Sequence, residues 1–320
     1  MTIKGIKLAV IAAIILMMTT PSLGAITKNE AEQIALPYVR TDETLKIIGP
    51  YTCENHSYYY AEITIIDSLS GVLIIDGENG KVVTDKETAK KVSYTRACFE
   101  NVTSIELEAF KRSKIVYTDV AASNRQMAEL FEDEMTRHNA ADRKKLEAIV
   151  NSYREEADVH DILANNMEQI SATQADIISG NASYENAMIL TDQKKDWEDN
   201  LQKLGKALDK LRASTNAYYG GSTKNDSLDA AMKESKEVFV TKTTADIEEE
   251  NTNTKNRVEL DMKLMAARLN MTSGSETSEI KKSEVEKPKV EKPGAETPGF
   301  GLLFACCSIL IVGVLIKRRK

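Results

Sequence analysis

Long parts of the chain repeat apolar residues at three- and four-residue spacing, which is the spacing of amphipathic helices. Proline is absent from Tyr51 to Lys287, and glycine is absent from Lys81 to Ser179. Because these two residues interrupt helices most strongly, the pattern predicts long helices. We expect them at about residues 104–137, 139–179, 185–218 and 226–270, with breaks at 180–183 and 220–222. Thr103, Asn139 and Asp226 are the expected N-caps of the first, second and fourth helices.

Two of these expected helices carry an apolar seam. In the third helix it follows strict three-four spacing, which is typical of a coiled coil: Trp197, Leu201, Leu204, Leu208, Leu211, Thr215 and Tyr218. In the second helix the period is kept but polar residues enter: Leu146, Val150, Tyr153, Ala157, His160, Ala164, Met167 and Ser171. Residues 102–270 are therefore predicted to form an all-α antiparallel bundle or coiled coil, closed within one chain or between two.

Residues 26–92 follow a different pattern. Thr27 and Glu30 form a capping box that starts a helix reaching about Arg40, with Pro37 in its last turns. Runs rich in β-branched and aromatic residues then alternate with turns, and they predict strands at about 45–50, 58–66, 72–76 and 81–83. The predicted fold is a small α+β domain, one helix on an antiparallel sheet, followed by the all-α region.

Three segments of this domain carry a family resemblance: residues 26–35 (ITKNEAEQIA), 58–63 (YYYAEI) and 75–83 (IDGENGKVV). Together they resemble a PepSY domain, a small module of peptidase propeptides and secreted proteins. The resemblance implies a helix plus antiparallel strands and a role in binding or inhibiting peptidases. No peptidase accompanies the module in this chain.

Both ends of the chain indicate export. Residues 1–25 combine Lys4 and Lys7, an apolar core and small residues for cleavage after Gly24 or Ala25, which predicts a secretory signal peptide. A retained signal anchor is the alternative. At the other end, residues 300–316 are apolar apart from one serine and are followed by four basic residues. Such a segment is predicted to be a transmembrane helix with a cytoplasmic tail.

The C-terminal residues 298–320 also carry a second resemblance. The tripeptide Pro298, Gly299 and Phe300, the apolar span and the basic tail together resemble the PGF-CTERM sorting signal of archaeal surface proteins. The resemblance implies an archaeosortase-like processing enzyme, removal of the span and attachment of a lipid anchor. A plain membrane anchor is the other interpretation, and both place the protein at the outer cell surface.

Residues 271–297 are rich in charge, proline and Ser/Thr, and the sequence VEKP occurs twice, which predicts an unfolded tether. Without its two ends the chain keeps 36 Lys+Arg against 49 Asp+Glu, a net charge of about −13. A surface this acidic repels nucleic acid, so nucleic acid is not expected as a partner.

Cysteines and histidines offer little chemistry. Cys53 and Cys98 are a candidate disulfide, with two unpaired thiols as the alternative; closing the loop of about 45 residues would contribute about 4 kcal/mol. The three histidines are isolated, and no C-x-x-C or H-E-x-x-H motif occurs. We therefore expect no metal, no cofactor and no catalytic residues.

Four of the five N-x-S/T sequons in the chain fall at the expected breaks between elements. The five candidate N-glycosylation sites are Asn55, Asn101, Asn181, Asn225 and Asn270. Together these observations predict a non-enzymatic, membrane- or lipid-anchored surface protein that serves binding or envelope structure. Its expected partners are envelope proteins or a second copy bound through the helical region. The alternative is a regulator of an extracellular peptidase that acts through the PepSY-like module.

Overall fold

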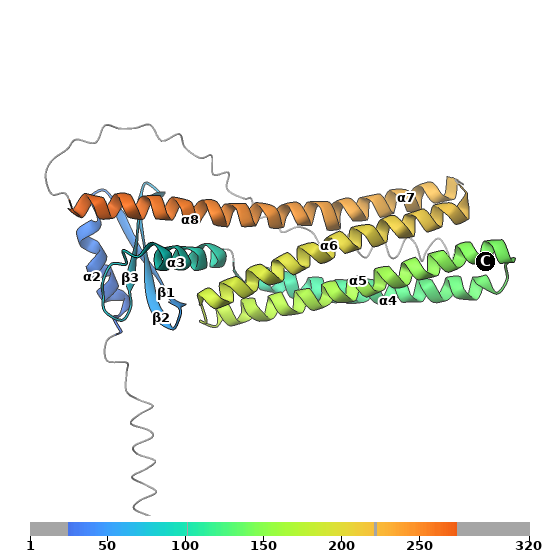
Figure 1. Cartoon of the computed structure of the whole chain (residues 1–320), viewed down its shortest axis with the longest axis horizontal. Helices are drawn as coiled ribbons and strands as arrows, with labels where there is room; N and C mark the ends of the chain where they lie inside the picture. Colours follow the sequence, from blue (N-terminus) through green and yellow to red (C-terminus); the bar gives the residue numbers. More distant parts are fainter. Residues whose placement is uncertain (1–24, 101, 221–222, 274–320) are drawn as a thin grey trace, which may run out of the picture. The chain divides into compact units, whose positions relative to one another are not determined.

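The computed structural model describes residues 25–100, 102–220 and 223–273 (Figure 1). Its residues divide into two compact units. The first unit runs to Ala97 and adds Ala182–Glu185 and the part of α8 (Thr243–Ser273) from Asn256 onward, and the second holds Cys98–Asn181 and Asn186–Lys255. The expected signal peptide, tether and sorting signal lie outside the described residues. Within those residues, the structure contains no helix with the length and apolarity needed to cross a membrane.

The first unit is built on a three-stranded antiparallel sheet in the order β1 (Thr44–Cys53), β2 (His56–Ile65) and β3 (Ser68–Asp76). The expected strand at 81–83 is wrong. Only an isolated bridge joins Val82 to Ile75, because the chain touches the edge of β3 briefly before it enters the next helix.

One face of the sheet is covered by α2 (Lys28–Ala35). The capping box is present as expected, with Thr27 and Glu30 bonding reciprocally. The helix ends earlier than the expected Arg40, because Pro37 falls in a single 3-10 turn, η1 (Leu36–Tyr38). The apolar core of this face combines small α2 residues with alternate strand residues: Ala31, Ala35, Ile47, Tyr59, Ala61, Ile63, Leu73 and Ile75.

The opposite face of the sheet is covered by two helices that lie far apart in the sequence. One is α3 (Lys86–Phe99), which the sequence analysis missed. The other is the C-terminal part of α8 (Thr243–Ser273), whose side chains reach Tyr60 and Glu62 of β2. The first unit therefore takes in more than residues 26–92, because the sheet has two faces to cover.

The second unit contains α4 (Ser104–Met135), α5 (Ala140–Ile178) and α6 (Tyr184–Tyr219). Thr103 and Asn139 cap the first two through their side chains, as expected. A further helical stretch follows as α7 (Thr223–Lys236), the π-helical segment η2 (Glu237–Lys242) and α8. It begins at Thr223, so the expected cap at Asp226 is wrong.

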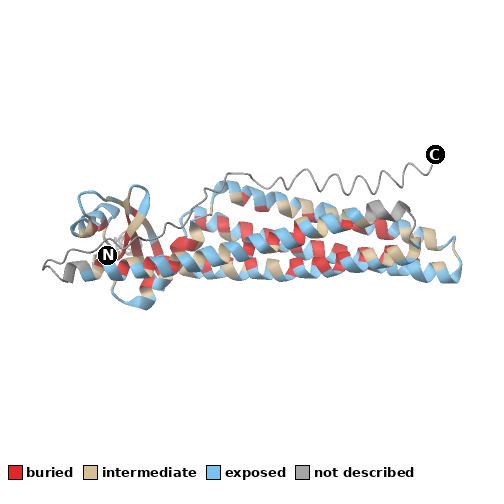
Figure 2. Cartoon of the chain, turned by 90° about the horizontal axis from the view of Figure 1, so that it is seen from above, coloured by how far each residue is buried: buried red, intermediate tan, exposed pale blue. Residues whose placement is uncertain are grey.

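The apolar seams of the second unit are buried as expected (Figure 2). All eight seam residues of α5 are buried, His160 included, and on α6 the five from Leu201 to Thr215 are buried while Trp197 and Tyr218 are partly buried. A single apolar cluster joins residues of α4, α5, α6, η2 and α8. The fold is thus a small antiparallel sheet followed by long helices, and the helices of the second unit share an apolar core of their own.

Helices α4 and α5 run antiparallel and approach closely. Ring contacts pair Tyr117 with His160 and Phe131 with Tyr153, so residue numbers rise on one helix as they fall on the other. Small buried side chains line both helices of the pair: Ala121, Ala128, Ala157 and Ala164. Small side chains allow two helix backbones to approach each other, which makes this pair sensitive to any enlarged residue.

Truncation of the apolar core should lower the stability of the second unit. We expect Leu163→Ala, at a fully buried position, to cost about 2–5 kcal/mol of unfolding free energy, because it leaves a cavity. Ile162→Ala, next to it on α5 but 43% exposed, is the matched control and should cost below about 1 kcal/mol. Urea unfolding followed by the fluorescence of Trp197 measures both, and equal losses would contradict the assigned core.

Candidate functional site

A buried ion pair fixes the end of α8 to the start of β1. Arg268 donates two hydrogen bonds to the Glu43 carboxylate, Nη2 to Oε1 at 2.7 Å and Nη1 to Oε2 at 2.9 Å. The two side chains are only 5% and 1% exposed. Nη1 also donates to the Tyr38 carbonyl at 2.9 Å, and Nη2 to the Ser70 carbonyl at 3.1 Å. We call this pair the Arg268 latch.

The surroundings of the Arg268 latch satisfy both charges. The Ser70 hydroxyl lies 3.1 Å from Glu43 Oε1, and the Arg40 backbone N–H donates to Oε2 at 2.8 Å. Burial raises the pKa of Glu43, but hydrogen bonds from Arg268, Arg40 and Ser70 outweigh it and hold the pKa below its usual value. The carboxylate is thus kept ionised by its donors, as a bidentate pair requires.

Gly71 leaves the space that the guanidinium occupies. A Cβ at this position would lie 2.5 Å from Arg268 Nε and 2.6 Å from Nη2, too close for any side chain. Because hydrogen bonds to Glu43, Tyr38 and Ser70 hold the guanidinium, it has little freedom to move aside. The glycine in β3 is therefore part of the Arg268 latch.

A second polar cluster lies on the same face of the sheet, around Glu62. Two arginines bond to Glu62 Oε1. Arg257 Nη2 of α8 lies 2.8 Å from it, and Arg96 Nη2 of α3 lies 3.2 Å from it. Arg257 Nε also pairs with Oδ1 of Asp261 at 2.9 Å. Asp261 is fully buried, and burial raises its pKa although Arg257 opposes the rise. The cluster joins α3, β2 and α8.

The chemistry of these two clusters favours attachment over catalysis. The arginines are matched by carboxylates, and both clusters lie under helices with little access to water. Buried ion pairs of this type contribute little net stability but fix the register of the elements they join, because an unmatched charge would be costly. We therefore regard the two clusters as contacts that hold the end of α8 on the sheet.

The second unit has its own buried polar groups. Lys194 of α6, only 8% exposed, pairs with Glu250 of α8 at 2.6 Å and with Glu106 of α4 at 3.7 Å. Burial raises the pKa of Glu106, and Lys194 opposes that rise. Asn200 donates to the Asn166 amide oxygen at 2.8 Å, which links α6 to α5. These contacts specify which helices lie side by side.

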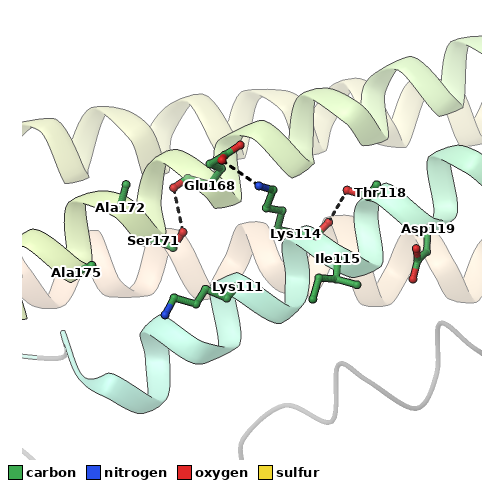
Figure 3. A pocket seen from close by; sticks show the side chains of 9 residues that line it. All are labelled: Lys111, Lys114, Ile115, Thr118, Asp119, Glu168, Ser171, Ala172 and Ala175. Atoms are coloured by element: carbon green, nitrogen blue, oxygen red, sulfur yellow. Dashed lines mark hydrogen bonds and ion pairs between the residues drawn. The ribbon is translucent and has the colours of Figure 1, made fainter.

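An open groove runs over α4 and α5, with a volume of about 550 Å³. Figure 3 shows the Lys114–Glu168 ion pair spanning it, with Ile115 and the alanines Ala172 and Ala175 along its walls. Its polar residues bond within their own helices or to each other. The groove shows no converging set of acid, base and nucleophile.

The structure draws no disulfide between the candidate residues Cys53 and Cys98. Cys53 is buried in β1, and Cys98 is partly buried near the end of α3, where its Sγ lies 3.9 Å from Thr191 Oγ1. Burial raises the pKa of the Cys53 thiol, which lowers its reactivity.

The sequons fall in different surroundings. Asn55 is exposed in the turn between β1 and β2, and Asn181 is exposed after α5. Asn270 is exposed in the last turns of α8, inside the helix because α8 continues to Ser273. Asn225 lies in the first turn of α7, and Asn101 falls outside the described residues. Glycosylation at these sites stays a prediction.

The histidines are separated as the sequence implied. His56 pairs with Glu78 at 3.2 Å and His138 with Glu134 at 3.1 Å, whereas His160 is buried in the α5 seam. Over the described ranges, no three His, Cys, Asp or Glu side chains converge in a way that could hold a metal ion.

Comparison with known proteins returned no relative: no family model, no curated protein and no solved structure matches the chain. Sequence reasoning missed Arg257 and Arg268, and also Glu43 and Glu62. Their only signal was weak, namely two arginines spaced eleven residues apart on an otherwise half-apolar helix end.

Breaking the Arg268 latch should destabilise the first unit. We expect Arg268→Met to cost about 3–5 kcal/mol, because Glu43 would stay buried without a counter-charge. The double variant Glu43→Leu with Arg268→Met should recover most of that loss. Near-ultraviolet circular dichroism of the tyrosines during urea unfolding measures it.

The control for this pair is Arg125→Met, which removes an exposed Arg–Asp contact between α4 and α5 and should cost below about 1 kcal/mol. If the single and double variants lose the same stability, Glu43 and Arg268 are not coupled.

Gly71→Ala should also weaken the latch, by about 1–3 kcal/mol, because the added methyl group pushes the guanidinium from Glu43. Gly205→Ala in α6 is the comparison, since the nearest atoms to a Cβ there are a Val240 methyl group at 3.4 Å and Lys236 Cε at 3.7 Å, at the far ends of their side chains. The loss for Gly71→Ala should be much smaller when it is made in the double variant without the ion pair. A loss of the same size there would mean that the methyl group acts elsewhere.

Proposed function

We propose that the chain is a non-enzymatic surface protein, exported and then held at the outer face of the membrane by its C-terminal segment or by a lipid attached near it. The proposal is supported by two sequence patterns in one chain: the predicted signal peptide over 1–25 and the segment resembling a PGF-CTERM signal over 298–320. The sequence between them is acidic and contains five sequons, which suits an exported protein.

We further propose that the second unit is an antiparallel helical bundle. Three sets of contacts support it. Arg154 bonds to Glu132 between α5 and α4, Ser214 lies 3.2 Å from Ser152 between α6 and α5, and Lys194 bonds to Glu250 between α6 and α8. A shared apolar cluster from the same helices is the core expected of such a bundle.

The Arg268 latch gives this proposal a physical basis. Helix α8 ends at Ser273, five residues after Arg268, and the predicted tether follows it in the sequence. A tether attached there would transmit its pull to β1 and β3 through Glu43 and Ser70. Pulling the α8 end off the sheet would leave Glu43 buried without its counter-charge, which is costly.

Binding or envelope structure is therefore the role we assign, in preference to peptidase inhibition. Both faces of the PepSY-like sheet are already covered by helices of the same chain, α2 on one side and α3 with α8 on the other. A partner would have to bind through exposed helix surfaces or loops.

The anchoring proposal predicts a processed protein at the cell surface. Intact cells treated with an external protease should lose the protein, and the mature mass should lack residues 1–25 and the span after Phe300. Replacing Pro298, Gly299 and Phe300 by alanine should leave the span attached, because the processing enzyme would no longer recognise it. Protection of the protein in intact cells would refute the proposal, and an unprocessed but surface-exposed chain would favour the plain membrane anchor.

A further inference from the structure

The seam between α4 and α5 contains two ionisable side chains one helical turn apart, Glu156 and His160. They are 6% and 3% exposed. His160 Nδ1 donates a hydrogen bond to the Glu156 backbone carbonyl at 2.8 Å, which fixes the proton of the neutral imidazole on Nδ1. The imidazole ring also lies against Tyr117 of α4, with ring centres 5.9 Å apart.

Among the described residues, no cation acts on the Glu156 carboxyl, whereas the Asp161 carboxylate, next to His160 on α5, favours the charged form of the imidazole. The neighbour of the Glu156 carboxyl on α4 is the neutral amide of Asn124, and Glu156 Oε2 has no hydrogen-bond partner. On α5 itself the nearby ionisable groups are Tyr153 and Asp161.

Charged residues at the same level are already paired with one another near the surface. Arg125 of α4 binds Asp158 and Asp161, so Asp161 is neutralised outside the seam. On α6, Lys210 binds Glu155, and Asp209 binds Lys236 of α7. None of these cations is left to stabilise an ionised Glu156.

Burial therefore acts on the two groups in opposite directions. It raises the pKa of Glu156 from 4.5 to about 7, with Asn124 opposing the rise. It lowers the pKa of His160 from 6.5 to about 4, with the hydrogen bond to the Glu156 carbonyl opposing the fall. In weak acid both side chains are neutral in the folded chain and charged in the unfolded chain.

We propose that Glu156 and His160 form a compensating pair, in which the pH dependence that each buried group imposes on the helical unit is offset by the other. The Glu156 contribution is full below about pH 4.5 and is lost as pH rises through 7. The His160 contribution is full above about pH 6.5 and is lost as pH falls through 4. Between about pH 4.5 and pH 6.5 the folded chain holds one proton more on Glu156 than the unfolded chain does, and one proton fewer on His160. The two contributions to the pH dependence of the unfolding free energy therefore cancel.

Single variants of the full chain separate the two contributions. Trp197 is the only tryptophan and lies in the second unit, so its fluorescence during urea unfolding reports that unit. Relative to wild type, the folding constant of Glu156→Gln should rise about 100-fold between pH 4 and pH 8. The folding constant of His160→Gln, again relative to wild type, should rise about 100-fold as the pH is lowered from 8 to 4.

Glu147→Gln, at an exposed position of α5, is the control and should show no such trend. Ratios for Glu156→Gln and His160→Gln that do not change with pH would overturn the proposal. If either variant does not fold, carbon-13 NMR of the wild-type chain at pH 5.5 decides. A protonated Glu156 carboxyl together with a neutral His160 ring supports the pair, and charge on either group refutes it.

Discussion

The ion pair between Glu43 and Arg268 is the interaction on which the first unit depends. Its two residues lie 225 positions apart in the sequence, and their side chains are almost completely buried. Ionised groups are stable in such a position only when each meets the other's charge and the remaining donors and acceptors are filled. The carbonyls of Tyr38 and Ser70 and the space left by Gly71 meet those conditions. The latch therefore joins α8 to a sheet formed by the first quarter of the chain.

Much of the architecture could be predicted from the sequence, because it depends on local patterns. The α5 and α6 seams gave the buried faces of both helices, and the caps at Thr103 and Asn139 gave the starts of α4 and α5. The runs of β-branched and aromatic residues at 58–66 and 72–76 predicted two neighbouring strands, and β2 and β3 pair at these positions. In each case, residues within a few turns or one hairpin carry the whole signal.

Features that depend on distant residues could not be predicted. Helix α3 buries Ser93, Thr95 and Arg96 as well as apolar residues, so its pattern is weakly amphipathic, and its partner is the sheet. The Arg268 latch leaves even less trace, because a charged residue on a helix is normally exposed to solvent. Nothing near Glu43 or Arg268 in the sequence indicates that the two meet.

The end of α8 is a constituent part of the first unit, held there by the Arg268 latch. Hydrogen–deuterium exchange of the full chain tests this attachment, because each backbone amide reports the opening of its own segment. We expect the amides of residues 258–268 and of β3 to be protected to a similar degree, and Arg268→Met to lower the protection of both. Rapid exchange over 258–268 in the wild-type chain, with β3 fully protected, would contradict it.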